Sequence, residues 1–118
     1  MYIKYLKSKL QGLVVTDKNL HYAGSIKLDS EFLKKANIKP YEVVLVINLN
    51  NAERFETYVI PAKEGSKVVS LQGGAARLGE IGDELIIMSF CYLEENKKVS
   101  PITIILKDNK IKKIFVKK

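Results

Sequence analysis

Short strand-like segments separated by turn residues constrain the fold of this chain more than any other feature. Residues 43–48 form a continuous apolar run, and residues 54–60 alternate so that successive side chains fall on opposite faces of a strand. Residues 84–93 form the longest apolar segment. The remaining strand-like segments are shorter or more polar: residues 9–16, 25–29, 67–71, 102–106 and 111–116. This pattern is typical of a mainly β protein, and a small β-barrel is the expected architecture.

Residues 29–37 have the clearest helical pattern in the chain. Asp29 can cap the start of the helix, and Glu31 suits the positive end of the helix dipole. Asn37 can close the last turn. Residues 75–78, which follow a pair of glycines, are expected to form a short helical turn. Turns are also expected at residues 48–51, 82–83 and 108–109.

Length and composition indicate one compact domain. The chain has 118 residues, of which 47% are apolar, so we expect a single domain over residues 1–118. No apolar run reaches the roughly 18 residues that a membrane span needs, and the start lacks the long apolar segment of a signal peptide. We therefore expect a cytoplasmic protein with no membrane partner. The single cysteine agrees with this, because one thiol cannot form a disulfide within the chain.

The net charge of +7 suits solubility, a nucleic-acid surface or a field that attracts small anions. Lysines are spread along the chain, with a denser run at residues 107–118, and aromatic residues do not interleave with them as base stacking would require. We therefore expect no nucleic-acid partner. The single histidine, His21, and the single cysteine, Cys91, cannot form a Cys/His metal cluster, so no metal is expected.

Three local patterns contain candidate site residues. Gly24-Ser25 places a flexible residue before a hydroxyl at the start of a strand. A second strand carries Arg54, Thr57 and Tyr58, and a glycine-rich helical turn further along the chain offers closely spaced backbone N–H groups. Each pattern also has an ordinary explanation when it is taken alone: a turn, a packed aromatic side chain, or a solvated surface charge.

Together with Lys9 and residues 81–87, these patterns resemble the signature stretches of pyruvoyl-dependent aspartate 1-decarboxylases, from about residue 5 to residue 93. The resemblance implies a six-stranded double-psi β-barrel with short helices, assembled as a homotetramer with active sites between subunits. It implies self-cleavage into fragments 1–24 and 25–118, which leaves a covalent pyruvoyl group derived from Ser25. The implied reaction converts L-aspartate to β-alanine and CO2 for pantothenate and coenzyme A synthesis.

The resemblance also implies a role for each candidate residue. The Ser25 hydroxyl attacks the carbonyl of Gly24, and the glycine permits the distorted backbone that this step needs. Thr57 donates a hydrogen bond to the oxyanion that forms. The pyruvoyl carbonyl forms a Schiff base with the substrate amine, and Tyr58 reprotonates the product carbon. The groups expected to bind the two substrate carboxylates are Arg54, Lys9 and the backbone N–H groups of Gly73, Gly74 and Ala75, and Thr57 is also expected to contact the substrate.

Three positions depart from the family pattern. Gln11 and Gln72 stand where the family usually has His and Asn, and Gly74 stands where it usually has Ala. Gln11, Gln72 and Tyr22 are interpreted as supporting residues, with Gln11 affecting substrate choice and Gln72 affecting self-cleavage. Three alternatives stay open: a pyruvoyl-dependent decarboxylase of another amino acid, an uncleaved non-catalytic paralogue that acts as an interaction subunit, and a basic barrel that binds nucleic acid.

Overall fold

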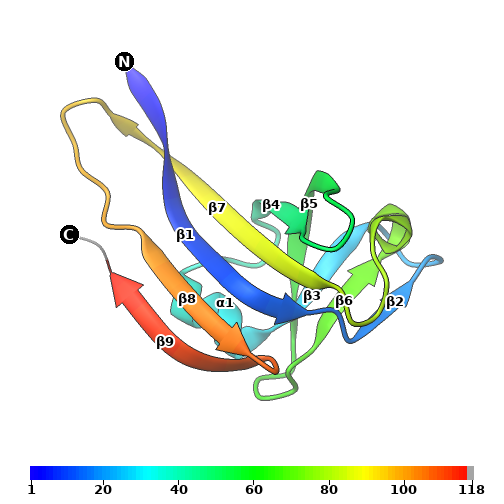
Figure 1. The fold of residues 1–118 in the computed structure, drawn as a ribbon. Coiled ribbons are helices and arrows are strands. Elements are labelled where there is room, and N and C mark those ends of the chain that lie inside the picture. Colours follow the sequence, from blue (N-terminus) through cyan, green and yellow to red (C-terminus); the bar gives the residue numbers. More distant parts are fainter. Residues whose placement is uncertain (117–118) are drawn as a thin grey trace.

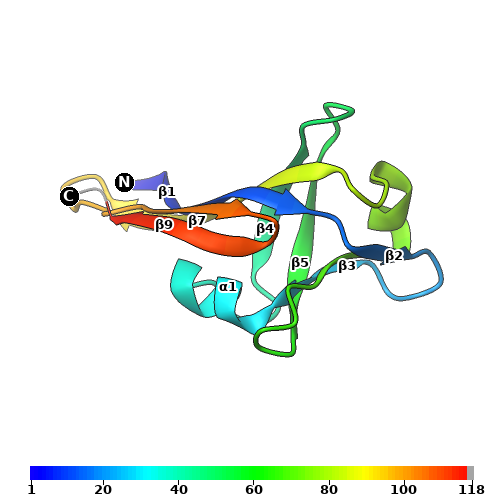
Figure 2. The ribbon, with the colours of Figure 1, turned by 60° about the horizontal axis from the view of Figure 1, so that its bottom comes forward.

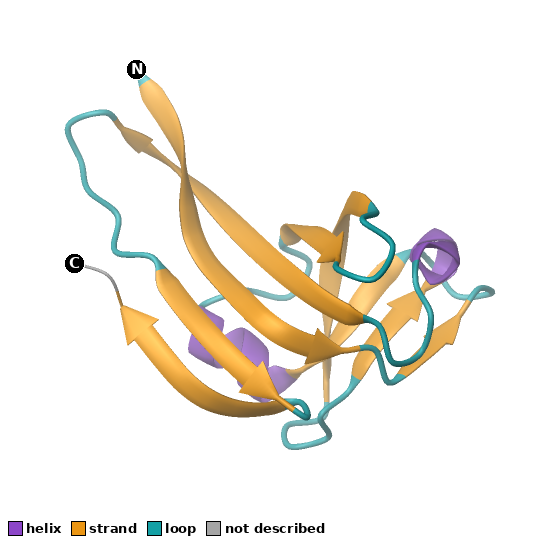
Figure 3. Ribbon diagram, viewed as in Figure 1, coloured by secondary structure: helices purple, strands orange, loops and turns teal. Residues whose placement is uncertain are grey.

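The computed structural model describes residues 1–116, in which nine strands form one sheet. Strands far outnumber helices (Figure 1; Figure 3), which confirms the prediction of a mainly β protein. The strands are β1 (Tyr2–Val14), β2 (Asp17–Asn19), β3 (Ser25–Asp29), β4 (Val43–Asn48), β5 (Arg54–Ala62), β6 (Val69–Gln72), β7 (Glu84–Glu94), β8 (Ile102–Lys107) and β9 (Lys110–Val116). Their order across the sheet is β2-β6-β3-β5-β4-β7-β1-β8-β9.

Two short helices accompany the sheet: α1 (Ser30–Ala36) and the 3-10 helix η1 (Gly73–Leu78). The predicted caps of α1 are confirmed: an Asp29 carboxylate oxygen accepts the Glu31 N–H at 2.9 Å, and Asn37 ends the helix in the left-handed conformation. The buried Asp29 carboxylate also accepts the backbone N–H groups of Gly65 and Lys67. Within the described residues, no helix is long and apolar enough to cross a membrane.

One face of the sheet forms the core, because residues in register on neighbouring strands share a face. Val46, Ile87, Leu10 and Ile104 lie side by side on β4, β7, β1 and β8, and all four are fully buried. Figure 2, in which β1, β7 and β9 lie nearly edge-on, shows α1 on one side only of these strands. We call the opposite side the outer face; its residues include Leu45, Ile47, Arg54, Ile86, Met88, Lys9, Gln11, Thr103 and Ile105.

The first two strands connect distant parts of the sheet. Only Val15 and Thr16 separate β1 from β2, and their N–H groups donate to Asp83 O at 2.9 Å and to Val69 O at 2.8 Å. β1 pairs antiparallel with β7 and parallel with β8, whereas β2 pairs parallel with β6. The continuous segment from β1 to β2 therefore pairs with β7 through its first part and with β6 through its second part.

A C-terminal hairpin of β8 and β9 extends the sheet beyond β1. The predicted turn is confirmed: Asp108 and Asn109 have φ values of 53° and 54°, as a tight hairpin turn requires. The buried Asn109 side chain accepts the Val14 N–H at 2.8 Å, donates to Val14 O at 2.9 Å and donates to Lys67 O at 3.1 Å. These bonds fasten the tip of the hairpin to the end of β1.

Some element boundaries differ from the sequence predictions. β1 begins at Tyr2 instead of residue 9, because its first residues pair with β7 as far as Glu94. β2 is absent from the sequence prediction, since its three polar residues are extended through pairing with β6 and not through their own β propensity. η1 begins at Gly73, two residues before the predicted helical turn.

Candidate functional site

Ser25 begins β3 where this strand pairs with the end of β6. It lies opposite Gln72 in the antiparallel ladder and is fully buried. Its Oγ donates to Gln72 Oε1 at 3.3 Å and has a longer contact of 3.5 Å with the carbonyl oxygen of Ala23. The hydroxyl of the predicted nucleophile therefore has two acceptors, of which Gln72 Oε1 is the nearer.

Gly73 packs directly against the backbone of Tyr22 and Gly24, just before the Gly24-Ser25 peptide bond. Its φ is +65°, and a Cβ added to it would lie 2.6 Å from Gly24 Cα, Gly24 N and Tyr22 O. A Cβ added to Gly74 would meet nothing within 4 Å. The structure therefore brings several predicted site residues together at what we call the junction: Tyr22, Gly24, Ser25, Gln72, Gly73 and Gly74, with the buried Ala75 next in η1.

A chain of hydrogen bonds leads from Gln72 to the surface. Gln72 Nε2 donates to Ser70 Oγ at 3.5 Å, and Ser70 Oγ donates to Asp17 Oδ2 at 3.1 Å. Ser70 is buried, whereas Asp17 is exposed on β2, where Thr16 Oγ1 donates to its other oxygen. No motif selects Asp17 or Ser70 from the sequence, because they stand 53 residues apart and only the pairing of β2 with β6 joins them.

Thr57 and Tyr58 lie on β5, the parallel neighbour of β3. Ile26 pairs with Val59, so the register places Tyr58 level with Ser25, and Thr57 level with the residue before it. Neighbouring strands are about 4.8 Å apart, so this part of β5 lies directly beside the junction. The two side chains are half-buried and point to opposite faces of β5.

Arg54 and Gln11 stand in one row on the outer face. The row runs from Arg54 through Ile47 and Ile86 to Gln11, on β5, β4, β7 and β1. Three strand spacings of about 4.8 Å put the Cα atoms of Arg54 and Gln11 about 14 Å apart. Lys9 lies two residues before Gln11 on the same face, and β7, β4 and β5 stand between its strand and β3 in the sheet order. The structure therefore does not bring Lys9 and Gln11 next to the junction of the same chain.

Lys9 and Arg54 form no ion pair with an acidic side chain in the part of the chain that the structure describes. Among residues 1–116, neither lies within 4.0 Å of a carboxylate, whereas Lys7 binds Glu42 at 2.8 Å. Lys9 is half-buried and Arg54 is exposed. Both charges are available to an anionic ligand, and the net charge of +7 favours the approach of one.

Gln11 lines a surface hollow of about 390 Å³ with residues of the C-terminal hairpin, among them Phe115. Thr103 and Ile105 also line it, and they are in register with Lys9 and Gln11 on the outer face. The C-terminal hairpin matches the signature stretches least, yet it forms the wall beside Gln11. The parallel pairing of β8 with β1, which no local pattern predicts, brings it there.

A family model of aspartate decarboxylases matches residues 1–112. The chain belongs to the aspartate decarboxylase family. The aspartate 1-decarboxylase of Thermosipho africanus is 50% identical over 103 residues, which cover 87% of this chain and 86% of the relative. The one of Coprothermobacter proteolyticus is 46% identical over 115 residues, which cover 97% and 96%. The one of Chlorobium phaeovibrioides is 50% identical over 111 residues, which cover 92% and 87%. The resemblance drawn from the sequence is thereby confirmed.

The aspartate decarboxylase family implies a pyruvoyl group, and the residues of the junction fit its formation. Such a group derives from a serine, whose hydroxyl must reach the preceding carbonyl. Gly24-Ser25 supplies both, the hydroxyl donates to Gln72, and the missing side chain of Gly73 leaves room for the backbone of Tyr22 and Gly24. Within the described residues, no three His, Cys, Asp or Glu side chains are grouped to hold a metal ion.

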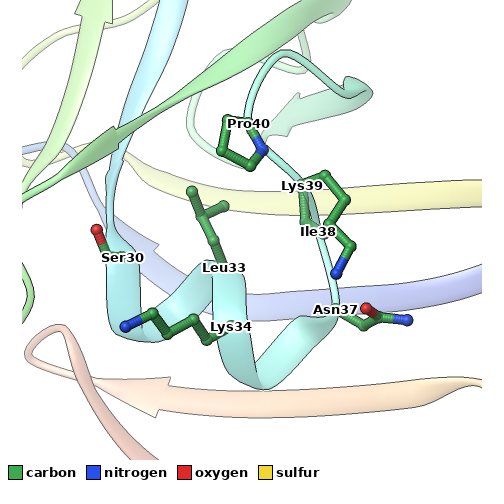
Figure 4. A pocket seen from close by; sticks show the side chains of 7 residues that line it. All are labelled: Ser30, Leu33, Lys34, Asn37, Ile38, Lys39 and Pro40. Atoms are coloured by element: carbon green, nitrogen blue, oxygen red, sulfur yellow. The ribbon is translucent and has the colours of Figure 1, made fainter.

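A second hollow, of about 320 Å³, lies beside α1 (Figure 4). Leu33 and Lys34 of the helix line one side, and Ile38 and Pro40 of the following segment line the other. Because α1 follows the C-terminal end of β3 and Ser25 stands at the N-terminal end of that strand, this hollow is separate from the junction.

Proposed function

We propose that this protein is a self-processing, pyruvoyl-dependent aspartate 1-decarboxylase. It converts L-aspartate to β-alanine and CO2 and thereby supplies pantothenate and coenzyme A synthesis. The observation that carries the proposal is the junction, where the buried Ser25 hydroxyl donates to Gln72 and Gly73 packs against Gly24. Three relatives named aspartate 1-decarboxylase, 46–50% identical over 87–97% of this chain, support it.

Self-processing begins when Ser25 Oγ adds to the carbonyl carbon of Gly24 and loses its proton. The C–N bond then breaks, which gives an ester and a free amine at residue 25. Loss of the Cα proton of residue 25 breaks the Cβ–O bond, so that the carboxylate of fragment 1–24 departs and dehydroalanine remains. Water converts the dehydroalanine to a pyruvoyl group and ammonia. Thr57 is the proposed donor to the oxyanion, and its position level with Gly24 supports this role.

The pyruvoyl group supplies an electron-withdrawing carbonyl for the decarboxylation of the bound amino acid. Arg54 and Lys9 bind the two carboxylates of aspartate, a role supported by the absence of acidic partners for both among the described residues. Tyr58, level with Ser25, donates a proton to the product carbon. A carboxylate oxygen also accepts from the backbone N–H groups at the start of η1: Gly73, Gly74 and Ala75.

The active sites lie between the subunits of a homotetramer. Among the described strands, β1 pairs with β7 and β8, whereas β3 pairs with β5 and β6, so Lys9 and Ser25 lie on strands that do not pair, and a neighbouring chain brings such groups together. The outer face, which carries Lys9 and Arg54, also presents Leu45, Met88 and Val43, of which the last is 56% exposed. An apolar face of this kind suits a subunit interface that covers the substrate site.

The sheet closes as a six-stranded double-psi β-barrel. β1 and β2 count as one bent strand, because Val15 and Thr16 stay hydrogen-bonded between them. The order β1/β2-β6-β3-β5-β4-β7 then returns to β1, and the hairpin of β8 and β9 lies outside the barrel. We also propose that the enzyme works in the cytoplasm, because a chain with one cysteine forms no disulfide of its own.

Denaturing mass spectrometry of the purified protein tests self-processing. We expect two fragments that correspond to residues 1–24 and 25–118, the second with a pyruvoyl group at its start and a ketone that reacts with hydrazines. The Ser25→Ala variant is the matched control, and it should stay one intact chain. A wild-type chain that remains uncut after prolonged warming would show a non-catalytic paralogue instead.

Release of CO2 from carboxyl-labelled amino acids tests the substrate. The processed enzyme should act on L-aspartate and release much less CO2 from L-glutamate, whose extra methylene separates the two carboxylates further. The Arg54→Ala variant should still be cut but lose most of its turnover, because the substrate loses a bidentate partner. A preference for another amino acid would assign the pyruvoyl chemistry to a different substrate.

A further inference from the structure

We propose that Asp17 is a positioning residue for self-cleavage: its carboxylate sets the direction of the hydrogen-bond chain through Ser70 and Gln72 and thereby aims the Ser25 hydroxyl. The proposal rests on the self-processing described above and assigns it two further residues, Asp17 and Ser70. Neither touches the scissile peptide bond in the structure.

The chain contains three hydrogen bonds in sequence. Ser25 Oγ donates to Gln72 Oε1 at 3.3 Å, Gln72 Nε2 donates to Ser70 Oγ at 3.5 Å, and Ser70 Oγ donates to Asp17 Oδ2 at 3.1 Å. Ser25, Ser70 and Gln72 are 0%, 1% and 8% exposed, so water competes little for their bonds. Asp17 is exposed and closes the chain at the surface of β2.

The direction of the chain follows from the chemistry of its last member. An ionised carboxylate accepts hydrogen bonds and donates none, so the Ser70 hydroxyl must donate to Asp17. The Ser70 oxygen is then left to accept from the Gln72 amide nitrogen. The carbonyl oxygen on the opposite side of that amide must therefore face Ser25 and accept a hydrogen bond from its hydroxyl.

This direction suits a nucleophile. When its proton points at Gln72, the Ser25 oxygen keeps its lone pairs free for the carbonyl carbon of Gly24. Without an acceptor-only group at residue 17, the Ser70 hydroxyl can donate to Gln72 Oε1, and the Gln72 amide can turn over. Gln72 Nε2 would then donate to Ser25 Oγ and occupy a lone pair that the attack requires.

Variants at residue 17 distinguish the effect of the carboxylate charge on self-cleavage from the effect of side-chain size. Asp17→Asn keeps the size of the side chain but introduces a donor, whereas Asp17→Glu changes the size but keeps an acceptor-only carboxylate. We expect Asp17→Asn to slow self-cleavage about tenfold, and Asp17→Glu to stay within about threefold of wild type, by the usual difference between charged and neutral hydrogen bonds. Asp108→Asn removes the same charge at an exposed turn without touching the chain of hydrogen bonds, and it should cut at the wild-type rate.

Cleavage is followed by denaturing mass spectrometry of chains made in a short pulse of in vitro translation, and thermal unfolding is measured on each variant in a Ser25→Ala background. Ser70→Ala should also cut slowly, and Asp17→Asn added to it should cause no further slowing, because the two residues act through one chain. Unfolding midpoints within about 2–3 °C of the parent would exclude general destabilisation.

The possible results separate this proposal from the proposed function. If wild type is cut and Asp17→Asn is cut equally fast, the role of Asp17 is refuted while the self-processing enzyme stands. Equal slowing in Asp17→Asn and Asp17→Glu, or slowing that multiplies in the Asp17→Asn, Ser70→Ala double variant, also refutes the direction-setting role. A wild-type chain that is never cut overturns both proposals.

Discussion

Replacement of Gly73 by alanine tests how closely η1 must approach the junction. The added Cβ would lie 2.6 Å from Gly24 Cα, Gly24 N and Tyr22 O, all of them backbone atoms. Carbon atoms in contact normally stay about 3.5–4.0 Å apart, so the segment around Gly24 has to move by about 1 Å. That segment is exposed, whereas Gly73 is buried, so the loop that contains the scissile bond should move and not η1.

Two costs add in the Gly73→Ala variant. The φ of +65° costs an alanine about 1–2 kcal/mol relative to glycine, and relief of the overlap costs about 1–3 kcal/mol. We therefore expect a loss of about 2–5 kcal/mol in the free energy of unfolding. A displacement of about 1 Å at the reacting bond also slows chemistry by about a hundredfold, so self-cleavage should fall by a similar factor.

The assay uses urea unfolding followed by circular dichroism, at one protein concentration, with every chain carrying Ser25→Ala so that all remain uncut. Gly74→Ala is the matched control, because its Cβ meets nothing within 4 Å and it should leave stability and cleavage almost unchanged. Cleavage rates are measured separately with Ser25 intact. Equal stability and equal cleavage of the Gly73→Ala and Gly74→Ala variants would refute the close packing of Gly73 against Gly24.

Two further predictions concern acidic side chains away from the junction. Asp29→Ala should lower the free energy of unfolding by about 3–5 kcal/mol in urea, because it removes a helix cap and leaves the N–H groups of Gly65 and Lys67 without an acceptor; a loss below about 1 kcal/mol would contradict this. The N–H donors of Asn48 and then Glu80 lower the pKa of Asp83, so its ionised form stabilises the fold above its unfolded pKa of about 4, and this contribution is lost as the pH falls through the lower folded value. The midpoint temperature of thermal unfolding of the Asp83→Asn variant should therefore fall less steeply below about pH 4 than that of wild type. An identical fall would contradict a stabilising role of the ionised Asp83.

Local patterns predicted the elements whose structure depends on nearby residues. The caps of α1 at Asp29 and Asn37 and the hairpin turn at Asp108 and Asn109 were all predictable, because each involves backbone conformations or bonds within a few residues. The buried Asn109 side chain shows the limit of this reasoning. It was identified as a turn residue, yet its bonds to Val14 stabilise an end of β1 that lies 95 residues earlier in the chain.

Long-range pairing explains what the sequence could not predict. β2 is a strand only because Asp17 and its neighbours pair with β6, and the same pairing places Asp17 beside Ser70. Gly24-Ser25 resembles an ordinary turn when it is taken alone and became a candidate only together with the other patterns, and its contact with Gly73 requires the turn that joins β6 to η1. The sequence patterns thus indicated the candidate site at Gly24-Ser25, and long-range strand pairing places Ser70 and Asp17 near it.

The two glutamines that depart from the family pattern lie in different parts of the fold. Gln72 retains an acceptor for Ser25 at 3.3 Å, and its side chain donates to Ser70, so this departure leaves the hydroxyl with a partner. Gln11 lies on the outer face, with β7, β4 and β5 between its strand and β3, and it lines the hollow beside Thr103. We therefore expect an effect of Gln72 on the proposed self-cleavage and an effect of Gln11 on substrate binding. The two can be measured independently, because in the proposed mechanism a chain is cut before its own site can react with substrate.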